Sequence, residues 1–260
     1  MKTIQALKAE LKETFKPAPW IEELENDTRA GVQQALRSWH KAYEKRSEIK
    51  KNHEDKKRFD NSYAPFQGAL IAGTDEAGRG PLAGPVVTAA VILPNDTDEL
   101  IGLDDSKKIS KKERERFAEI IKRIAVAWSV NIQSTERIDE LNIYAATRES
   151  MEQSINSLAV SPNQVLADAM RLNVNCPAVS IVKGDAQSLT IAAASILAKT
   201  TRDNLMDELH ETYPMYRFDK HAGYGTPEHL TAIEEYGPCI HHRKTFEPIK
   251  TILAKLEAHQ

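Results

Sequence analysis

LIAGTDEAGRG, at residues 70–80, decides how this 260-residue chain folds. Residues 70–74 form a short apolar run, which is typical of a buried strand. Two acids, Asp75 and Glu76, follow it, and glycines then flank Arg79. The glycine- and proline-rich residues 78–85 lead into a second apolar run at 86–93. The sequence therefore predicts a β-hairpin whose connection begins with two acids and is rich in glycine.

Helices and short strands alternate along the rest of the chain. Ser110 and Glu113 form a capping box, in which each side chain satisfies a backbone N–H of the other residue, and a helix is expected from there to about Ile124. The other expected elements are strands at 126–132, 164–168 and 179–182, and helices at 138–158, 191–211 and 226–236, the last helix opening at Thr226-Pro227. A hairpin followed by this alternation indicates an α/β layered domain.

Acidic residues stand at the ends of three expected strands. Asp75 and Glu76 end the first strand, and two later strands run into Asp168 and Asp185. A single Asp after a strand commonly only turns the chain or caps a helix. Several acids at neighbouring strand ends are different, because each carboxylate raises the pKa of the others unless a cation lies between them. Oxygen ligands without His or Cys favour Mg²⁺ or Mn²⁺ over zinc.

The adjacent pair Asp75 and Glu76 needs a particular backbone. Neighbouring residues of a strand point to opposite faces, so the chain is expected to leave regular strand geometry here if both acids bind one metal. Gly78 and Gly80 follow at once and allow another backbone to approach closely. Two acids, Arg79 and two accessible backbone amides within residues 75–80 suit a phosphodiester bridged to a metal.

Several segments of the body together resemble the type 2 ribonucleases H. They are residues 75–80 with Gly84-Pro85-Val86, residues 105–108 (DSKK), residues 183–185 (KGD), residues 193–199 with Arg202-Asp203, and residues 223–226 with His229. The resemblance covers about residues 68–245. The Gly-Arg-Gly of residues 78–80 is similar to ribonuclease HII, whereas ribonuclease HIII typically has Gly-Thr-Gly and a larger N-terminal domain. The chain looks like a ribonuclease HII with an N-terminal helical extension.

The resemblance implies a fold and an activity. The fold is a ribonuclease H-like mixed β-sheet flanked by helices. The activity is hydrolysis 5′ to a ribonucleotide, in RNA/DNA hybrids and at single ribonucleotides in duplex DNA, which leaves 3′-hydroxyl and 5′-phosphate ends. Two divalent ions, Mg²⁺ or Mn²⁺, are expected to activate water and stabilise the leaving oxygen, so no side chain acts as nucleophile.

The resemblance also implies roles for individual residues. The catalytic, metal-binding acids of the family match Asp75, Glu76, Asp168 and Asp185. The turn that reads the ribose 2′-hydroxyl and grips the adjacent phosphate matches Gly78, Arg79 and Gly80. The tyrosine that packs on the following deoxyribose matches Tyr224, and Lys107 is expected to contact phosphate.

The sequence leaves other residues and other functions open. His229, His241 and His242 lack metal-ligand spacing and are expected at the surface or behind the site. Ser195, Lys199 and Arg202 are left out of the catalytic set, although one polar residue of that helix is expected to face substrate; Arg202 is expected to pair with Asp203 or Asp207. The alternative functions are a ribonuclease HIII-like nuclease without single-ribonucleotide activity, a non-catalytic hybrid-binding protein, and a Mg²⁺ phosphatase.

Residues 1–66 are expected to form a helical extension, distinct from a catalytic domain at 67–260. Apolar stripes run through Ile4, Leu7, Leu11 and Phe15, and through Val32, Leu36, Trp39 and Tyr43. This segment has a net charge of +3 and the rest −6, counted from the sequence. The basic stretch 37–58 is either a solvated helix face or an arm that contacts phosphate. Removal of residues 1–66 is expected to leave a cleaving core with weaker binding.

The amino-acid composition further narrows the class of protein and its cellular compartment. Hydrophobic residues make up 41% and charged residues 28%, which is typical of soluble globular domains. Cys176 and Cys239 have no zinc or disulfide spacing, so a reducing cytoplasm is expected. The N-terminus does not resemble a signal peptide and no apolar run is long enough to span a membrane. We expect a monomer.

Overall fold

The computed structural model of the chain describes residues 2–106 and 108–258. It divides into two compact units, Met1–Glu54 and Asp55–Gln260. The helix α3 (Ala30–Ser62) belongs to both, since the division falls within it. The division into two compact units does not show whether residues 1–66 or 67–260 fold alone. The predicted domain boundary at residue 66 therefore stays a prediction.

The first unit is a small helical head. Its helices are α1 (Ile4–Glu13), α2 (Pro19–Glu23), the short 3-10 helix η1 (Leu24–Asn26) and most of α3. The predicted stripes form its core, which contains Leu11, Ile21, Leu36 and Trp39. Phe15 is an exception, because α1 ends at Glu13 and leaves the Phe15 side chain 62% exposed.

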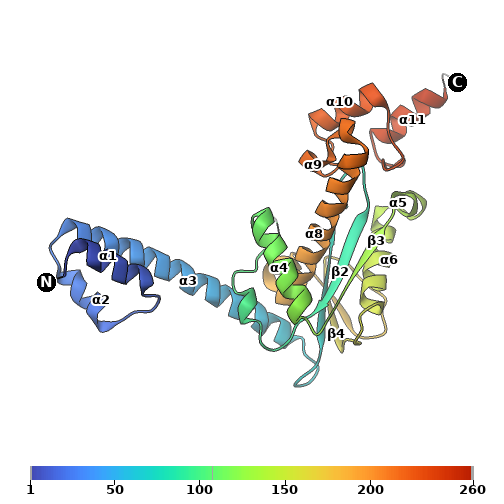
Figure 1. Cartoon of the computed structure of the whole chain (residues 1–260). Coiled ribbons are helices and arrows are strands. Elements are labelled where there is room, and N and C mark those ends of the chain that lie inside the picture. Colours follow the sequence, from blue (N-terminus) through green and yellow to red (C-terminus); the bar gives the residue numbers. More distant parts are fainter. Residues whose placement is uncertain (1, 107, 259–260) are drawn as a thin grey trace. The chain divides into compact units, whose positions relative to one another are not determined.

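The second unit is built on a mixed five-stranded sheet (Figure 1). The strands are β1 (Ile71–Ala77), β2 (Val86–Ile92), β3 (Ala127–Gln133), β4 (Gln164–Asp168) and β5 (Ala178–Ile181), in the order β3-β2-β1-β4-β5. Strands β1, β2 and β3 pair antiparallel, whereas β4 is parallel to both β1 and β5. This confirms the predicted mixed sheet.

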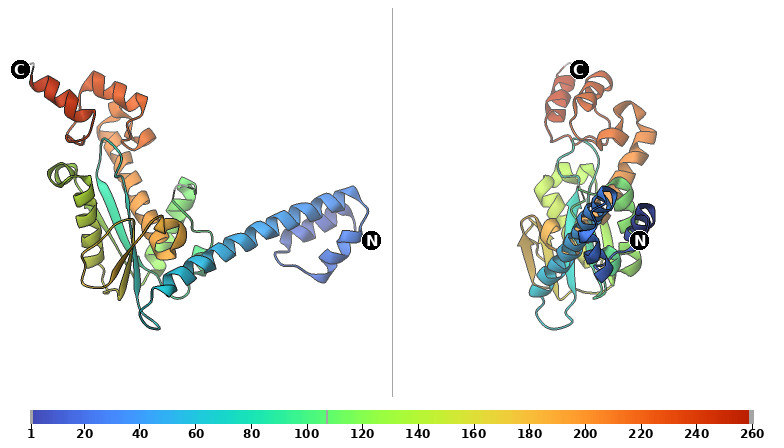
Figure 2. Two further views of the ribbon diagram at one scale, coloured as in Figure 1. Left: turned by 180° about the vertical axis from the view of Figure 1, so that it is seen from behind. Right: turned by 90° about the vertical axis from the view of Figure 1, so that its left-hand side faces the viewer.

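Helices cover both faces of the sheet, as Figures 1 and 2 show for α6 and α8. On one face, α8 (Leu189–Thr212) and α4 (Lys111–Ile124) pack on Ala89 and Val91 of β2. On the other face, α6 (Ile143–Asn156) packs on Ala90 and Ile92. Strand β2 is therefore buried along its whole length, which explains why its sequence is a continuous apolar run.

Close packing of α8 on β1 depends on Gly73. A Cβ atom at Gly73 would lie 2.1 Å from the backbone carbon of Thr190, in the first turn of α8. Any side chain there would push α8 off the sheet. The small residues of α8 therefore serve helix–sheet packing, and they place the polar side chains farther along that helix near the end of β1.

Two expectations about the helices were wrong. The helix expected at 138–158 is divided into α5 (Thr135–Leu141) and α6, because Asn142 has a φ of 74° and its side chain caps α6. A positive φ is more common for Asn than for most residues other than Gly. The helix expected to be the last, α10 (Pro227–Tyr236), is followed by α11 (Ile249–Glu257).

The C-terminal region forms a second small core. The 3-10 helix η3 (Pro214–Tyr216) and α9 (Phe218–His221) come before α10 and α11, and residues from all four pack with Leu82 and Met206. The remaining short helices are the 3-10 helix η2 (Asp98–Leu100) and α7 (Gly184–Gln187). Among the described residues, no helix is long and apolar enough to cross a membrane.

Candidate active site

A cavity of about 410 Å³ opens at the carboxyl end of β1. Its lining contains nearly every residue predicted from the sequence: Asp75, Glu76, Gly78, Arg79, Gly80, Asp168, Asp185 and Tyr224, together with Ala77, Ser106, Ser195, Lys199 and Arg202. Lys107 lies outside the described residues. The structure thus brings together strand ends that are as far as 110 residues apart in the chain, counted from Asp75 to Asp185.

The two adjacent acids lie within a regular strand. β1 continues through Asp75 and Glu76, which pair with Ala89 and Thr88 of β2. The expected departure from strand geometry was therefore wrong, since pairing with β2 holds the backbone extended. The parallel partner ends earlier: the last pair of β1 with β4 is Thr74 with Ala167. Past that point the carboxylates are free to reach the cavity.

Burial and crowding both act on these carboxylates. Asp75 is 5% exposed, and burial, followed by the charges of Glu76 and Asp168, raises its pKa well above the ordinary value. Hydrogen bonds from the Ser195 hydroxyl and the Glu76 N–H offset only part of this rise. Burial also raises the pKa of Glu76, although Arg79 acts in the opposite direction, with 3.3 Å between Arg79 Nη1 and Glu76 Oε1.

The donor set fits a hard divalent cation. Glu76 Oε2 is buried and has no hydrogen-bond partner, so one lone-pair donor is available without displacing any protein contact. Asp168 Oδ1 accepts the Gly184 N–H at 2.6 Å, which orients that carboxylate beside the segment that carries Asp185. The four acids that line the cavity offer oxygen ligands, which Mg²⁺ and Mn²⁺ prefer.

The turn after β1 leaves no space for a side chain at Gly78. Its φ is +94°, and a Cβ atom would lie 2.0 Å from Arg202 Nε. The turn therefore lies directly on the Arg202 side chain. Arg79, by contrast, extends outward with its side chain 39% exposed, so its guanidinium is accessible to a ligand in the cavity.

Two buried arginines hold this turn from behind. Arg202 Nε donates to Pro85 O at 3.0 Å, and its two terminal nitrogens donate to Ala83 O and Ala222 O. Arg202 therefore does not form the intrahelical pair that was predicted; Asp203 pairs with Lys199 instead. Burial lowers the pKa of Arg202 to about 10.

Arg243 is the second of these arginines, and sequence reasoning missed it. Its guanidinium donates to the carbonyls of Gly78, Arg79 and Gly84. It is 0% exposed, and burial, followed by the charge of Arg202, lowers its pKa to about 9. No local pattern marks Arg243 in the sequence, because its acceptors are backbone groups of a segment about 160 residues earlier.

Tyr224 lies half-exposed on a loop that is also held from behind. The Gly223 carbonyl accepts the Leu82 N–H, so the loop is attached to the segment after the Gly78 turn. His229 Nδ1 lies 2.9 Å from Tyr224 O, and His229 Nε2 lies 3.1 Å from His242 Nε2. Both histidines are buried, so of the two expected positions, at the surface or behind the site, they take the second, and burial lowers the pKa of each to about 4.

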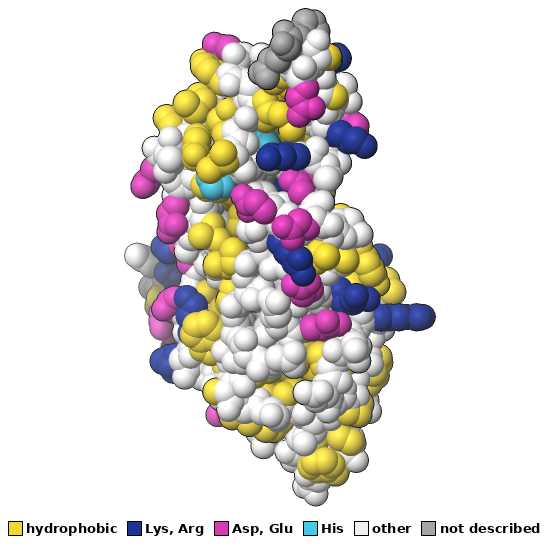
Figure 3. All heavy atoms as spheres, turned by 90° about the vertical axis from the view of Figure 1, so that its right-hand side faces the viewer, with side chains coloured by type: hydrophobic (Ala, Val, Ile, Leu, Met, Phe, Trp, Pro, Cys, Tyr) yellow, Lys and Arg dark blue, Asp and Glu magenta, His cyan; other side chains and the backbone are white. Residues whose placement is uncertain are grey.

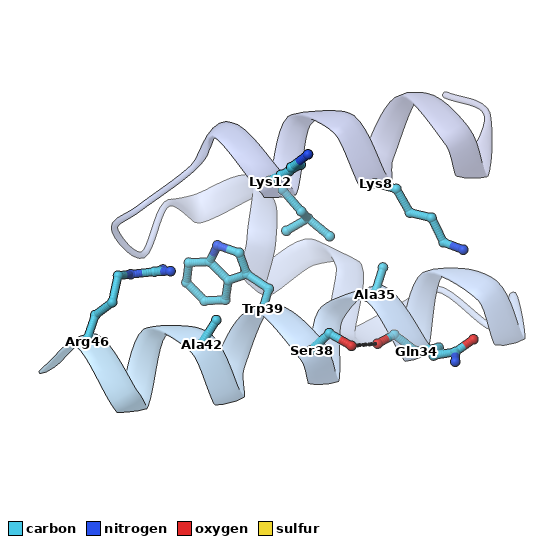
Figure 4. A pocket seen from close by; sticks show the side chains of 9 residues that line it. Lys8, Lys12, Gln34, Ala35, Ser38, Trp39, Ala42 and Arg46 are labelled. Carbon is cyan, nitrogen blue, oxygen red and sulfur yellow. Dashed lines mark hydrogen bonds between the residues drawn. The ribbon is translucent and has the colours of Figure 1, made fainter. Parts of the chain in front are cut away.

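The helical head carries a second cavity, of about 440 Å³, between α1 and α3 (Figure 4). Lys8, Lys12 and Arg46 surround it, and Leu11, Trp39 and two alanines form its apolar floor. No acidic residue lines it, and no ion pair of these three cations is found among the described residues. Figure 3 shows another face of the molecule, on which acidic and basic side chains are intermingled and neither charge covers a large area.

Comparisons with known proteins agree with these features. The family model described as Ribonuclease HII matches residues 72–248, and the model described as Ribonuclease HII N-terminal domain matches residues 3–64. A ribonuclease HII of Bacillus cytotoxicus is 49% identical over 227 residues, which cover 87% of each chain. One of Bacillus cereus is 48% identical over 89% of this chain and 90% of its own length.

Solved structures give the same fold. The ribonuclease H2 of Pyrococcus horikoshii superposes with a TM-score of 0.63 and 26% identity, over 72% of this chain and 99% of that protein. The ribonuclease HII of Archaeoglobus fulgidus, solved in a complex with PCNA, gives a TM-score of 0.60 and 28% identity over 70% and 96%.

Proposed function

Because this chain belongs to the ribonuclease HII family, and is therefore a hydrolytic nuclease for RNA/DNA hybrids, we propose that it also cleaves duplex DNA 5′ to a single embedded ribonucleotide. The products are a 3′-hydroxyl and a 5′-phosphate. The observation that carries the proposal is that one cavity contains the four carboxylates together with Arg79 and Tyr224. Metal binding and contact with one nucleotide can thus occur at the same place.

Asp75, Glu76, Asp168 and Asp185 would hold Mg²⁺ or Mn²⁺. A divalent cation bound there supplies positive charge for the phosphodiester and lowers the pKa of a water molecule. The protein contributes preorganisation: the Ser195 hydroxyl and the Gly184 N–H fix Asp75 and Asp168, so these carboxylates need little rearrangement when a cation binds.

The residues of the turn would recognise the ribonucleotide. Gly78 and Gly80 line the cavity, where a sugar could contact the backbone of the turn, and Arg79 provides an exposed guanidinium for an adjacent phosphate oxygen. The 2′-hydroxyl is the group by which a protein distinguishes RNA from DNA at one position. Tyr224 would pack on the next sugar, since its side chain is 49% exposed at the same cavity.

The test is cleavage of three duplexes that differ only in ribonucleotide content: none, one, and a run of at least four. We expect cutting of the second and third in the presence of Mg²⁺ or Mn²⁺, and no cutting after chelation. Cleavage confined to the run of ribonucleotides would favour the ribonuclease HIII-like alternative and refute single-ribonucleotide activity. Sequencing-gel mobility and phosphatase treatment of the product identify its 5′ end.

We propose a second role for the head, on the basis of its cavity. Lys8, Lys12 and Arg46 place three cations around one depression with no acid in the lining, so a polyanion such as a nucleic-acid backbone is the suitable ligand. Replacing all three by Gln in the full chain is expected to reduce the slope of log affinity against log salt by ~0.9 for each phosphate that the head no longer neutralises. Lys250→Gln, exposed on α11 outside the cavity, is the control. An unchanged slope would leave the head with a structural role only.

We further propose that the protein works as a monomer in the cytoplasm. Two free cysteines, Cys176 and Cys239, suit a reducing compartment. Light scattering coupled to size-exclusion chromatography tests the monomer: the expected mass is 29.1 kDa, and twice that mass would contradict it.

A further inference from the structure

The end of α3 lies in the same compact unit as the candidate active site. We call residues 55–62 the α3 end segment; all of them belong to the unit Asp55–Gln260. Its Lys56 is 2% exposed, although lysine is rarely buried without partners. Its ammonium group therefore needs acceptors inside the protein, and their identity shows what the segment does.

Lys56 has three acceptors, one of which belongs to a residue that lines the cavity. Nζ lies 3.1 Å from Asp104 Oδ1, and 3.4 Å from both Leu103 O and Asp185 O. Asp185 is one of the proposed metal ligands. One ammonium group thus joins the backbone of that ligand to the segment 103–104, although the two are about 80 residues apart in the chain.

The segment after Asp104 leads directly into the cavity. The Asp104 carboxylate also accepts the Asp105 N–H at 2.9 Å, which fixes the start of this stretch. Ser106 lines the cavity, and its Oγ lies 3.2 Å from Ser195 Oγ, the hydroxyl that contacts Asp75. Lys56 is therefore linked to Asp185 by one hydrogen bond. It is linked to Asp75 by three, from Lys56 to Asp104, from Ser106 to Ser195 and from Ser195 to Asp75.

Other contacts fix the α3 end segment on the elements that carry the acids. Phe59 packs with Ile71 of β1, Leu166 of β4 and Ile181 of β5 in one hydrophobic cluster. Asp60 Oδ2 accepts the Thr190 N–H at 2.9 Å, in the first turn of α8. The segment therefore cannot shift without moving Lys56 relative to Asp185.

We propose that Lys56 is a positioning residue of the metal centre. It fixes the position of the Asp185 backbone relative to the segment 103–106. The Asp185 carboxylate is thereby held facing the carboxylates of Asp75, Glu76 and Asp168. The proposal rests on the proposed function in one respect, namely that Asp185 binds the cation. It assigns to the N-terminal region, which matches its own family model at residues 3–64, a direct contribution to the site.

The test compares Lys56→Met with Lys51→Met in the full chain. Lys51 is exposed on the same helix, so its substitution removes the same charge without touching the cavity. We measure the Kd of Mn²⁺ by calorimetry, the melting temperature without metal, and kcat and KM for a hybrid substrate. Lys56→Met is expected to weaken Mn²⁺ binding and lower kcat by about tenfold each, the equivalent of about 1.4 kcal/mol, with KM for the hybrid nearly unchanged. Lys51→Met is expected to keep the wild-type Mn²⁺ affinity and kcat.

Lys56→Arg and Asp104→Asn keep the proposal testable if Lys56→Met does not fold. Lys56→Arg retains the charge and is expected to recover at least part of the Mn²⁺ affinity, whereas Asp104→Asn removes the ionic partner and is expected to weaken Mn²⁺ binding. A lower melting temperature with unchanged Mn²⁺ affinity in every variant would show that Lys56 only stabilises the fold. A wild-type protein that binds Mn²⁺ but does not cleave would instead refute the proposed function and leave the metal affinities interpretable.

Discussion

Two truncations at nearby residues should behave very differently. A chain that begins at Asp55 keeps the α3 end segment, whereas one that begins at Gln67 loses it. The composition of the sequence places the domain boundary at residue 66, but Lys56, Phe59 and Asp60 all have partners within the catalytic unit. We expect the chain from Asp55 to fold and cleave. The sequence alone predicts that the chain from Gln67 also cleaves, but these contacts lead us to expect that it is severely destabilised.

The magnitude follows from the interactions that the α3 end segment and the adjoining Tyr63 make with the rest of the unit. Half-burial of Phe59 and Tyr63 in the cluster with Ile71 contributes about 1 kcal/mol each. The buried bond from the Thr190 N–H to Asp60 contributes about 1–2 kcal/mol, and the Lys56–Asp104 pair about 1–2 kcal/mol, since Asp104 is partly exposed. The total is about 4–6 kcal/mol, a large fraction of the 5–15 kcal/mol that stabilises a typical domain.

The assay is thermal unfolding without metal at about pH 4, where Asp60 is protonated in the folded protein and its contribution to stability is present. For a domain of this size, about 4–6 kcal/mol corresponds to a melting temperature roughly 10–20 °C lower for the chain from Gln67 than for the chain from Asp55. Phe59→Ala in the chain from Asp55 separates the apolar part of this destabilisation from the polar part. Equal melting temperatures for the two truncated chains would refute the reasoning and support the boundary at residue 66.

Three substitutions test other parts of the account. Asp75→Asn should abolish cleavage and raise the melting temperature of the metal-free protein, because burial and the charges of Glu76 and Asp168 work against an ionised Asp75; substantial activity at saturating Mg²⁺ would contradict its role. Tyr224→Ala should lower kcat/KM on a single ribonucleotide roughly five- to tenfold, which corresponds to the lower end of about 1–3 kcal/mol for an aromatic platform. The reduction on a long hybrid should be smaller. Equal reductions on both substrates would show that Tyr224 does not recognise the junction between a ribonucleotide and DNA. Asp60 has its pKa raised by burial from 3.8 to about 6, so its contribution to stability is present below pH 3.8 and is lost as the pH rises through 6. Asp60→Asn should therefore be more favourable at pH 7 than at pH 4 by up to about 3 kcal/mol, measured by urea unfolding, and a pH-independent effect would contradict this assignment.

Much of the site could be predicted because its residues are contiguous in the sequence. The stretch from Asp75 to Gly80 places acids, glycines and Arg79 together before any tertiary structure forms. Even there the local backbone was predicted wrongly. Two adjacent acids at one metal were expected to require an irregular strand, and only the pairing with β2 shows that β1 continues through them.

The supporting residues could not be predicted, for a physical reason. Arg243 acts by bonding to backbone carbonyls of a distant turn, and a backbone carbonyl leaves no signature in the sequence of its partner. Lys56 stands in a run of charged residues on a helix, where a solvated side chain is the ordinary outcome. Only the packing of the α3 end segment shows that this lysine is buried beside Asp185.

The central claim is that one carboxylate-lined cavity cuts at a single ribonucleotide. The most direct test incubates wild type and Asp185→Asn, at saturating Mg²⁺, with duplex DNA that contains one ribonucleotide, and maps the cut at nucleotide resolution. The account predicts one cut 5′ to the ribonucleotide by the wild type and a rate at least about 100-fold lower in the variant, the lower range for removal of a preorganised electrostatic group. A wild type that leaves this duplex intact while cutting long hybrids, or a variant that still cuts it at a comparable rate, would contradict the claim.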